Sequence, residues 1–162
     1  MEQLQSITGP NGVSSSYTYD EYGRLNQSTE AIQGDQSFVT GYGYDDWNNN
    51  TSVKYPSGIT LSNTFNTDGY LTEIRNSDAL IWKLDDANSL GQPKQYSLGS
   101  SGLRTNFDYD TKGFVSKITT GIGEQSFNFD ANTGNLTTRS FKKTNNPATV
   151  SETFTYDNMN RL

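Results

Sequence analysis

The sequence predicts an all-β fold in which antiparallel β-hairpins repeat to form one elongated, twisted (spiralling) sheet. The first observation is a motif of two aromatic residues at i and i+2 followed by Asp, which returns at a spacing of roughly 20–25 residues. The second is that each copy continues into turn residues and then an apolar residue. Self-similarity at such a period is typical of repeat architectures. The seven copies begin at Tyr17, Tyr42, Asn63, Trp82, Phe107, Phe127 and Phe154.

The first element of each copy is a strand with alternating character. Tyr17 and Tyr19 flank Thr18, and side chains at i and i+2 point to the same face of a strand. This is the pattern of a half-buried antiparallel strand. Aliphatic residues are few, but ten Tyr and two Trp supply apolar area, so we expect an ordered protein with an aromatic core.

The second element is a tight turn. In Asp20–Gly23 the carboxylate can accept the backbone N–H two residues on, and the Gly can supply the positive φ that completes a hairpin with a bulge. Asn48 and Asn160 replace this Gly, and Asn is the residue that next best tolerates that conformation. The span from Asp85 to Gly91 is longer, which predicts an enlarged loop in the fourth copy.

A return strand and a looser turn complete each copy. Leu25 and Leu71 begin return strands, and Tyr-Pro-Ser-Gly at 55–58 is turn chemistry. Leu4 and Leu162 occupy the same phase of the repeat. We therefore expect residues 1–162 to form one array of about seven repeats, cut from a longer protein and without a separate second domain.

Composition narrows the function classes. The net charge is −6 without a basic cluster, which argues against binding of nucleic acid or anionic membranes. No apolar run approaches the ~20 residues of a membrane span, so no membrane insertion is expected. There is no Cys and no His, which removes thiolate chemistry and the commonest general base. Residues Met1 to Thr8 lack the features of a signal peptide.

The segments Tyr17–Leu25 and Phe154–Leu162 resemble the Tyr-Asp (YD) repeat of the RHS family, and the other copies agree in phase. The resemblance implies a spiralling strip of hairpins, which in large members closes into a shell around a C-terminal toxin or effector. It also implies a parent that is extracellular, cell wall-associated or secreted. Seven repeats are too few to close a shell, and no Asp-Pro is present, so shell closure and self-cleavage are not carried over.

The preferred function is a structural scaffold or shell segment of a larger bacterial surface or secreted protein, without catalysis or cofactor. Its expected partners are flanking repeats of the parent chain, with edge-to-edge self-association of unpaired strands. The alternative is a carbohydrate-binding or adhesion surface, because turn aromatics can stack on sugar rings. Its candidate residues are Tyr22, Trp47 and Tyr70, although aromatics at these positions can simply cover hairpin ends.

Two further readings have weaker support. The segment Asp108–Gly113 matches the first half of a calcium loop, but Lys112 and Thr119 stand where ligands should be, so a hairpin turn and no metal site are expected. The adjacent pairs Asp45–Asp46 and Asp85–Asp86 could suggest acid–base catalysis. Neighbours in a strand point to opposite faces, so no catalytic residues are expected there.

Overall fold

The computed structural model describes residues 3–34, 36–146 and 148–162. Met1 and Glu2, which open the stretch without signal-peptide character, lie outside these ranges. The chain divides into two compact units, one that ends at Ile81 and one that begins at Trp82. The described residues form strands and one short 3-10 helix, η1 (Pro10–Gly12), and contain no helix that is long and apolar enough to cross a membrane.

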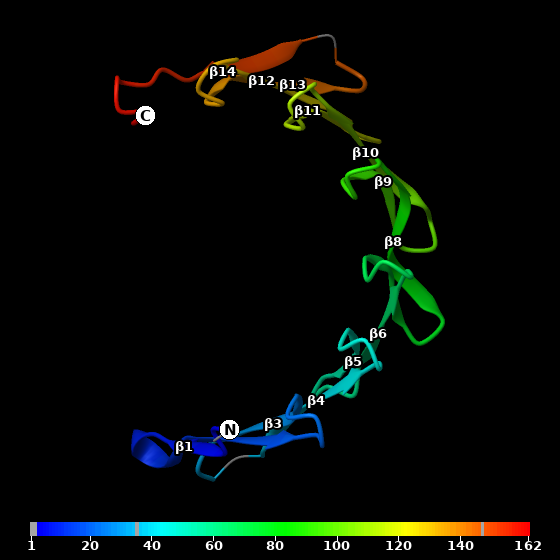
Figure 1. Cartoon of the computed structure of the whole chain (residues 1–162), viewed down its shortest axis with the longest axis vertical. Coiled ribbons are helices and arrows are strands. Elements are labelled where there is room, and N and C mark those ends of the chain that lie inside the picture. The colour runs from blue at the N-terminus through cyan, green and yellow to red at the C-terminus, as the bar shows by residue number, and fades with distance from the viewer. Residues whose placement is uncertain (1–2, 35, 147) are drawn as a thin grey trace. The chain divides into compact units, whose positions relative to one another are not determined.

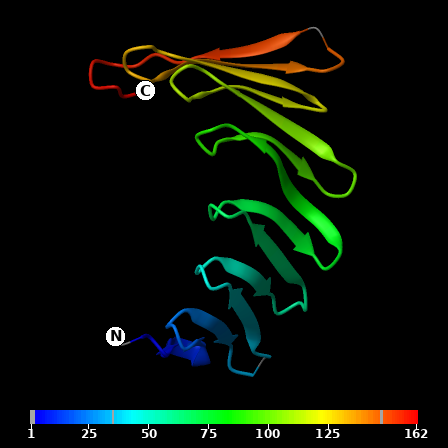
Figure 2. The same cartoon turned by 45° about the vertical axis from the view of Figure 1, so that its right-hand side comes forward.

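The first unit is a run of antiparallel strands in chain order (Figures 1 and 2). Each strand pairs with the next one along the chain, so neighbours in sequence are neighbours in the sheet. The strands are β1 (Ser6–Thr8), β2 (Ser14–Tyr19), β3 (Leu25–Ala31), β4 (Phe38–Tyr44), β5 (Asn50–Lys54), β6 (Thr60–Phe65) and β7 (Leu71–Asn76).

The second unit repeats this arrangement, and strands again pair antiparallel with their sequence neighbours. Its strands are β8 (Ala79–Ala87, of which Trp82 onward lies in this unit), β9 (Pro93–Leu98), β10 (Leu103–Tyr109), β11 (Val115–Thr120), β12 (Gly123–Phe129), β13 (Leu136–Lys143) and β14 (Thr149–Thr153). The predicted fold class, all-β with repeated antiparallel hairpins in an open sheet, is confirmed.

Five of the tight turns have the predicted bulge. In the β2–β3 hairpin the register shifts between Thr18 and Tyr19, one residue before the turn, and Gly23 at the end of the turn has a φ of 80°. The same shift precedes the turn in the hairpins β4–β5, β6–β7, β10–β11 and β12–β13. Asn48 and Asn160 hold the position of Gly23 with φ of 68° and 58°. The prediction that Asn replaces Gly at this left-handed position is confirmed.

The fourth copy corrects one prediction. The enlarged loop expected between Asp85 and Gly91 is wrong, because β8 continues to Ala87 and an ordinary turn follows at Asn88–Gly91. The extra residues are taken up inside the strand, where the register shifts on both sides of Asp86. Asn88 starts this turn just as Asn66 starts the third, which the sequence shows once the copies are aligned on Gly91.

The apolar side chains form half-buried rows rather than an enclosed core. Among the described residues no hydrophobic side chain is buried, and the buried polar ones are Ser97 and Thr105. Aromatic rings meet across strands instead: Tyr96 lies 5.6 Å from Phe107, between ring centroids. The expected aromatic core is therefore corrected to a single layer, whose strands are stabilised by ladder hydrogen bonds and cross-strand pairs.

Candidate functional site: the capped turns and the hollow beside Trp47

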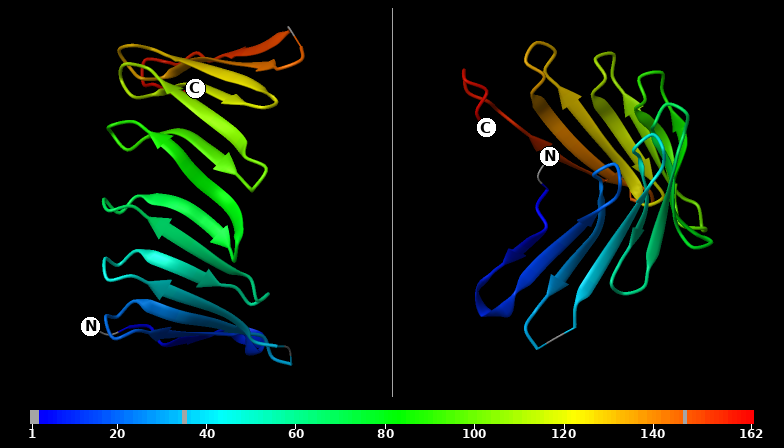
Figure 3. Two further views of the ribbon diagram at one scale, coloured as in Figure 1. Left: turned by 90° about the vertical axis from the view of Figure 1, so that its right-hand side faces the viewer. Right: turned by 60° about the horizontal axis from the view of Figure 1, so that its bottom comes forward.

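The tight turns gather at one end of the strands within each unit, and the looser turns at the other (Figure 3). In the first tight turn, Asp20 Oδ1 accepts hydrogen bonds from the backbone N–H of Tyr22 at 3.0 Å and of Arg24 at 2.8 Å. The predicted hydrogen bond from the amide two residues on is thus confirmed, and Asp20 also accepts a hydrogen bond from the amide four residues on. The same double cap is formed by Asp45, Asn66, Asn88, Asp110 and Asp157, and by Asp130 in a turn one residue longer.

The residue that closes a turn reaches toward the next turn. Arg24 donates from Nε to Asp20 Oδ2 at 2.7 Å and from Nη1 to the carbonyl of Asp45 at 2.8 Å. Its guanidinium carbon lies 5.0 Å from the ring centroid of Tyr22 and 4.7 Å from that of Tyr44. The space between the first two turns is therefore filled by one cation held between two rings and a carboxylate.

Other closing residues bridge in the same way with neutral side chains. Gln92 donates to the carbonyl of Gly113 at 3.0 Å, and Asn135 donates to the Asn160 side chain at 2.9 Å. These contacts link consecutive turns along the edge of the second unit. The closing position thus holds neighbouring repeats together, in addition to the strand ladder.

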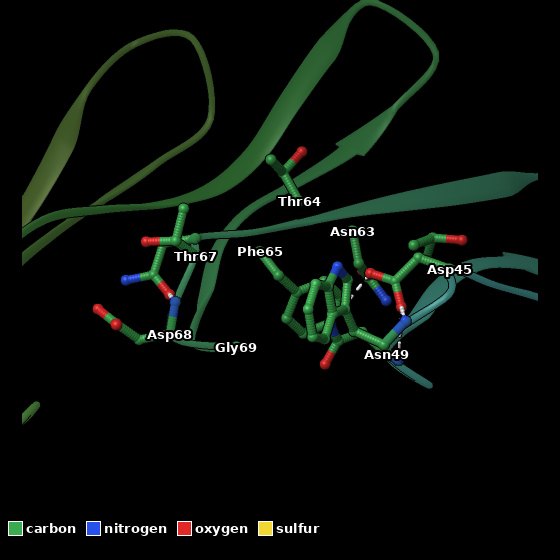
Figure 4. A pocket seen from close by; sticks show the side chains of 11 residues that line it. Asp45, Asn49, Asn63, Thr64, Phe65, Thr67, Asp68 and Gly69 are labelled. Carbon is green, nitrogen blue, oxygen red and sulfur yellow. Dashed lines mark hydrogen bonds between the residues drawn. The ribbon is translucent and has the colours of Figure 1, made fainter.

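The second turn differs because the side chain of its closing residue bonds within its own turn. Asn49 stands in the position of Arg24 and donates its side-chain N–H to Asp45 Oδ2 at 3.0 Å, within its own turn. A hollow of about 720 Å³ opens between the second and third turns (Figure 4). Its principal lining residues are Asp45, Trp47, Asn49, Phe65, Asn66 and Asp68.

The hollow combines aromatic and acidic groups. Trp47 is 86% exposed and lines it together with the ring of Phe65. Asp45 and Asp68 contribute carboxylates, and no Lys or Arg is among the described residues that line it. This combination distinguishes the hollow from the filled space around Arg24.

The predicted site residues do not converge. Tyr22 belongs to the first turn, where its ring lies against the guanidinium of Arg24. Tyr70 closes the third turn and donates its backbone N–H to Asn66 at 2.9 Å, with its side chain 54% exposed. Trp47 lines the hollow. Sequence reasoning missed the contribution of Phe65 and of the short Asn49, although a comparison of the same turn position across copies would have revealed both.

Three of the four carboxylates considered for catalysis have structural contacts. Asp45 caps its turn, Asp85 accepts a hydrogen bond from the Ser97 hydroxyl at 2.6 Å, and Asp86 pairs with Lys94 at 3.1 Å. Asp110, in the segment that resembles a calcium loop, caps the fifth turn. The described part of the chain contains no group of three or more acidic, His or Cys residues that could hold a metal ion.

Comparison with known proteins identifies the repeat. Residues 3–35 match the model of the RHS repeat, so the predicted recognition is confirmed there. The crystal structures of TcdB2-TccC3-Cdc42 and TcdB2-TccC3-TEV align with 96% of this chain at TM-scores of 0.79 and 0.80 and 15% and 14% identity. This chain spans 9% of each of those chains, so the likeness concerns the fold. No curated protein matches the chain.

Hydrogen bonds hold the pKa of several capping carboxylates below their ordinary value of 3.8. For Asp45 the side-chain amide of Asn49 contributes most to this lowered pKa, followed by the backbone amides of Asn49 and Trp47. For Asp157 the Arg161 side chain comes first in lowering the pKa. The charged form of each cap is therefore the form that the folded chain favours.

These lowered pKa values predict a loss of stability in acid. A carboxylate whose folded pKa lies below its unfolded pKa contributes stability above pH about 4, which is lost as the pH falls through the folded pKa. Asp45→Asn combined with Asp157→Asn keeps an oxygen cap, as Asn66 shows, but removes the titration. Urea midpoints between pH 6 and pH 2.5 should fall less steeply for this variant than for the wild type. Asp46→Asn, outside the capping position, is the control, and equal slopes for wild type and double variant would contradict the account.

Proposed function

We propose that this chain, whose residues 3–35 match the RHS repeat, is a structural β-repeat module in a larger, toxin-associated bacterial protein of the cell surface or secreted class. The observation that carries the proposal is that the recurring residues of the motif have folding roles. The Asp or Asn caps two amides, the Gly or Asn after it provides the positive φ, and the closing residues Arg24, Gln92 and Asn135 contact the next turn. The module has no catalysis or cofactor of its own in this proposal.

The partners of such a module are further repeats. The terminal strand β14 pairs with β13, all five of its residues are exposed, and Val150 is 69% exposed. A strand with one free edge is a template for another strand. We therefore propose that residues 1–162 belong to one continuous array that pairs with flanking repeats, as a scaffold or shell segment. The similar fold within the much longer TcdB2-TccC3 chains supports this proposal.

Carbohydrate recognition is the alternative function. The single observation in its favour is the highly exposed indole of Trp47, which shares a hollow with the amide side chains of Asn49 and Asn63. Aromatic faces and amides are groups that can contact sugar rings and hydroxyls. The hollow's two carboxylates, Asp45 and Asp68, can accept hydrogen bonds from sugar hydroxyls as well, and glycans remain the second candidate partner.

The scaffold proposal predicts that an added repeat stabilises its neighbour. Leu136 and Leu162 have the same phase, so a second copy of residues 137–162 appended after Leu162 continues the array. In a repeat protein each interface between neighbours adds stability. We expect slower amide exchange in β14 and a gain in unfolding free energy of about 1–3 kcal/mol from the new cross-strand pairs.

The control for this extension is an appended segment of the same composition in scrambled order, which should leave β14 exchange unchanged. If the repeat copy and the scrambled copy gave the same exchange rates and unfolding midpoints, a module that pairs with flanking repeats would be contradicted.

Among the described residues no strand pairs with the outer edge of β14, which predicts self-association of the isolated chain. We expect the apparent mass in light scattering to rise with concentration, because unpaired edges pair with other chains. Val150→Lys places a charge on that strand and should lower the association without changing the fold. A strict monomer at millimolar concentration would count against edge pairing.

A further inference from the structure

The filled space around Arg24 is a template for the hollow beside Trp47. Arg24 sits between two aromatic rings, with its Nε on the capping Asp20 and its Nη1 on the carbonyl of Asp45 that starts the next turn. Every one of these partners has an equivalent one repeat later. The equivalents of Asp20, Tyr22, Tyr44 and Asp45 are Asp45, Trp47, Phe65 and Asn66, and all four line the hollow.

The missing group is the guanidinium itself. Asn49 replaces Arg24, and its amide stays on Asp45 Oδ2 at 3.0 Å. The rings, the carboxylate and the next turn's first residue are retained, while the cation between them is absent from this position of the sequence. A hollow of about 720 Å³ remains, which exceeds the volume of one side chain and falls within the range of ligand sites.

The negative charge of the hollow also favours a cation as its occupant. Asp45 and Asp68 are among its lining residues, and hydrogen bonds from Asn49 and Trp47 help to keep the pKa of Asp45 low, so this carboxylate is ionised at neutral pH. The indole of Trp47 is the aromatic face that attracts cations most strongly. A flat, forked cation can stack on such a ring and donate hydrogen bonds to a carboxylate at the same time.

We propose that the hollow beside Trp47 binds an arginine side chain supplied by a peptide segment of a partner protein. The guanidinium stacks between Trp47 and Phe65 and donates to Asp45, as Arg24 does in cis one repeat earlier. Asp68 borders the hollow on the side away from Asp45, where the rest of the peptide lies (Figure 4). This assignment goes beyond the structural role of the repeats, and it competes with a neutral sugar for the same hollow.

Arginine is favoured over a sugar on two grounds. The internal template holds a guanidinium, and it uses the same kinds of group in the same order along the chain. A neutral sugar could donate hydroxyl hydrogen bonds to the carboxylates Asp45 and Asp68 but would gain no charge attraction, whereas a cation is attracted to both. A lysine ammonium would gain the charge attraction but cannot stack as a plane.

The test is a titration followed by the indole N–H signals in ¹H–¹⁵N spectra. The chain has two Trp, so two indole signals are expected, and Trp47→Phe assigns them. The probe is the blocked pentapeptide Gly-Gly-Arg-Gly-Gly, with citrulline in place of arginine as the neutral control of nearly the same shape. We expect the Trp47 signal to shift with the arginine peptide at a Kd on the order of 1 mM, the Trp82 signal to stay, and the citrulline peptide to have no effect.

Two variants sharpen the test. Asp45→Asn keeps the turn cap, as Asn66 does in the third turn, and should weaken the arginine peptide about fivefold or more by removing one charge. Asn49→Arg restores the residue found in the first turn and should abolish peptide binding by filling the hollow, while shifting the Trp47 signal without any peptide. Asp46→Asn is the control of equal charge change and should bind as the wild type does.

Three results would overturn the proposal: no shift with 20 mM arginine peptide, equal shifts with arginine and citrulline, or unchanged binding by Asn49→Arg in a folded chain. A parallel titration with maltose and chitobiose tests whether the hollow binds a sugar instead. Saturable shifts of Trp47 with a sugar alone would assign the hollow to carbohydrate instead. None of these results affects the expected stabilisation by an added repeat, so the scaffold proposal is tested independently.

Discussion

The interaction on which the rest of the structure depends is the pair of hydrogen bonds from two backbone amides to one side-chain oxygen at the start of each tight turn. Asp20 shows it at 3.0 and 2.8 Å, and Asn66 shows it with an amide oxygen at 3.0 and 2.9 Å. A hairpin of this kind contains few residues and cannot bury much apolar surface alone. The cap therefore fixes the turn, the turn fixes the bulge before it, and the bulge sets the register of both strands.

The control of strand register by the capped turns matters because the sheet is a single layer. The described residues include no buried hydrophobic side chain, so there is no enclosed core to select one register over another. Contacts between neighbouring repeats take over part of that role. The hydroxyl of Tyr44 donates to the carbonyl of Leu25 at 3.0 Å, and Arg24 spans from one turn to the next. Where the closing side chain bonds within its own turn, as Asn49 does, the edge opens into a hollow with its own binding chemistry.

Much of this was predictable because the determinants are short-range. The alternation of Tyr17, Thr18 and Tyr19 predicts the strand, and the Asp-x-x-Gly pattern predicts the cap, the positive φ and the bulge. The fourth turn is misplaced because Asp85 offers the same signal as the true cap, Asn88, and the two are distinguished only by aligning the copies on Gly91 or by the strand pairing. The hollow requires a comparison between copies: Trp47 and Phe65 come from consecutive repeats, and the exception at Asn49 appears only beside its equivalents Arg24 and Gln92.

The most direct test of the central role of the cap is amide hydrogen exchange measured residue by residue. In the tight turns other than the longer one at Asp130, the amides of the third and fifth residues donate to the capping oxygen, so they should exchange much more slowly than the amide of the second residue. Tyr22 and Arg24 should thus be protected relative to Glu21. Repetition of this pattern in the turns that start at Asp45, Asn66, Asn88, Asp110 and Asp157 is the predicted result. Uniformly fast exchange through the turns, with protection confined to the strands, would contradict it.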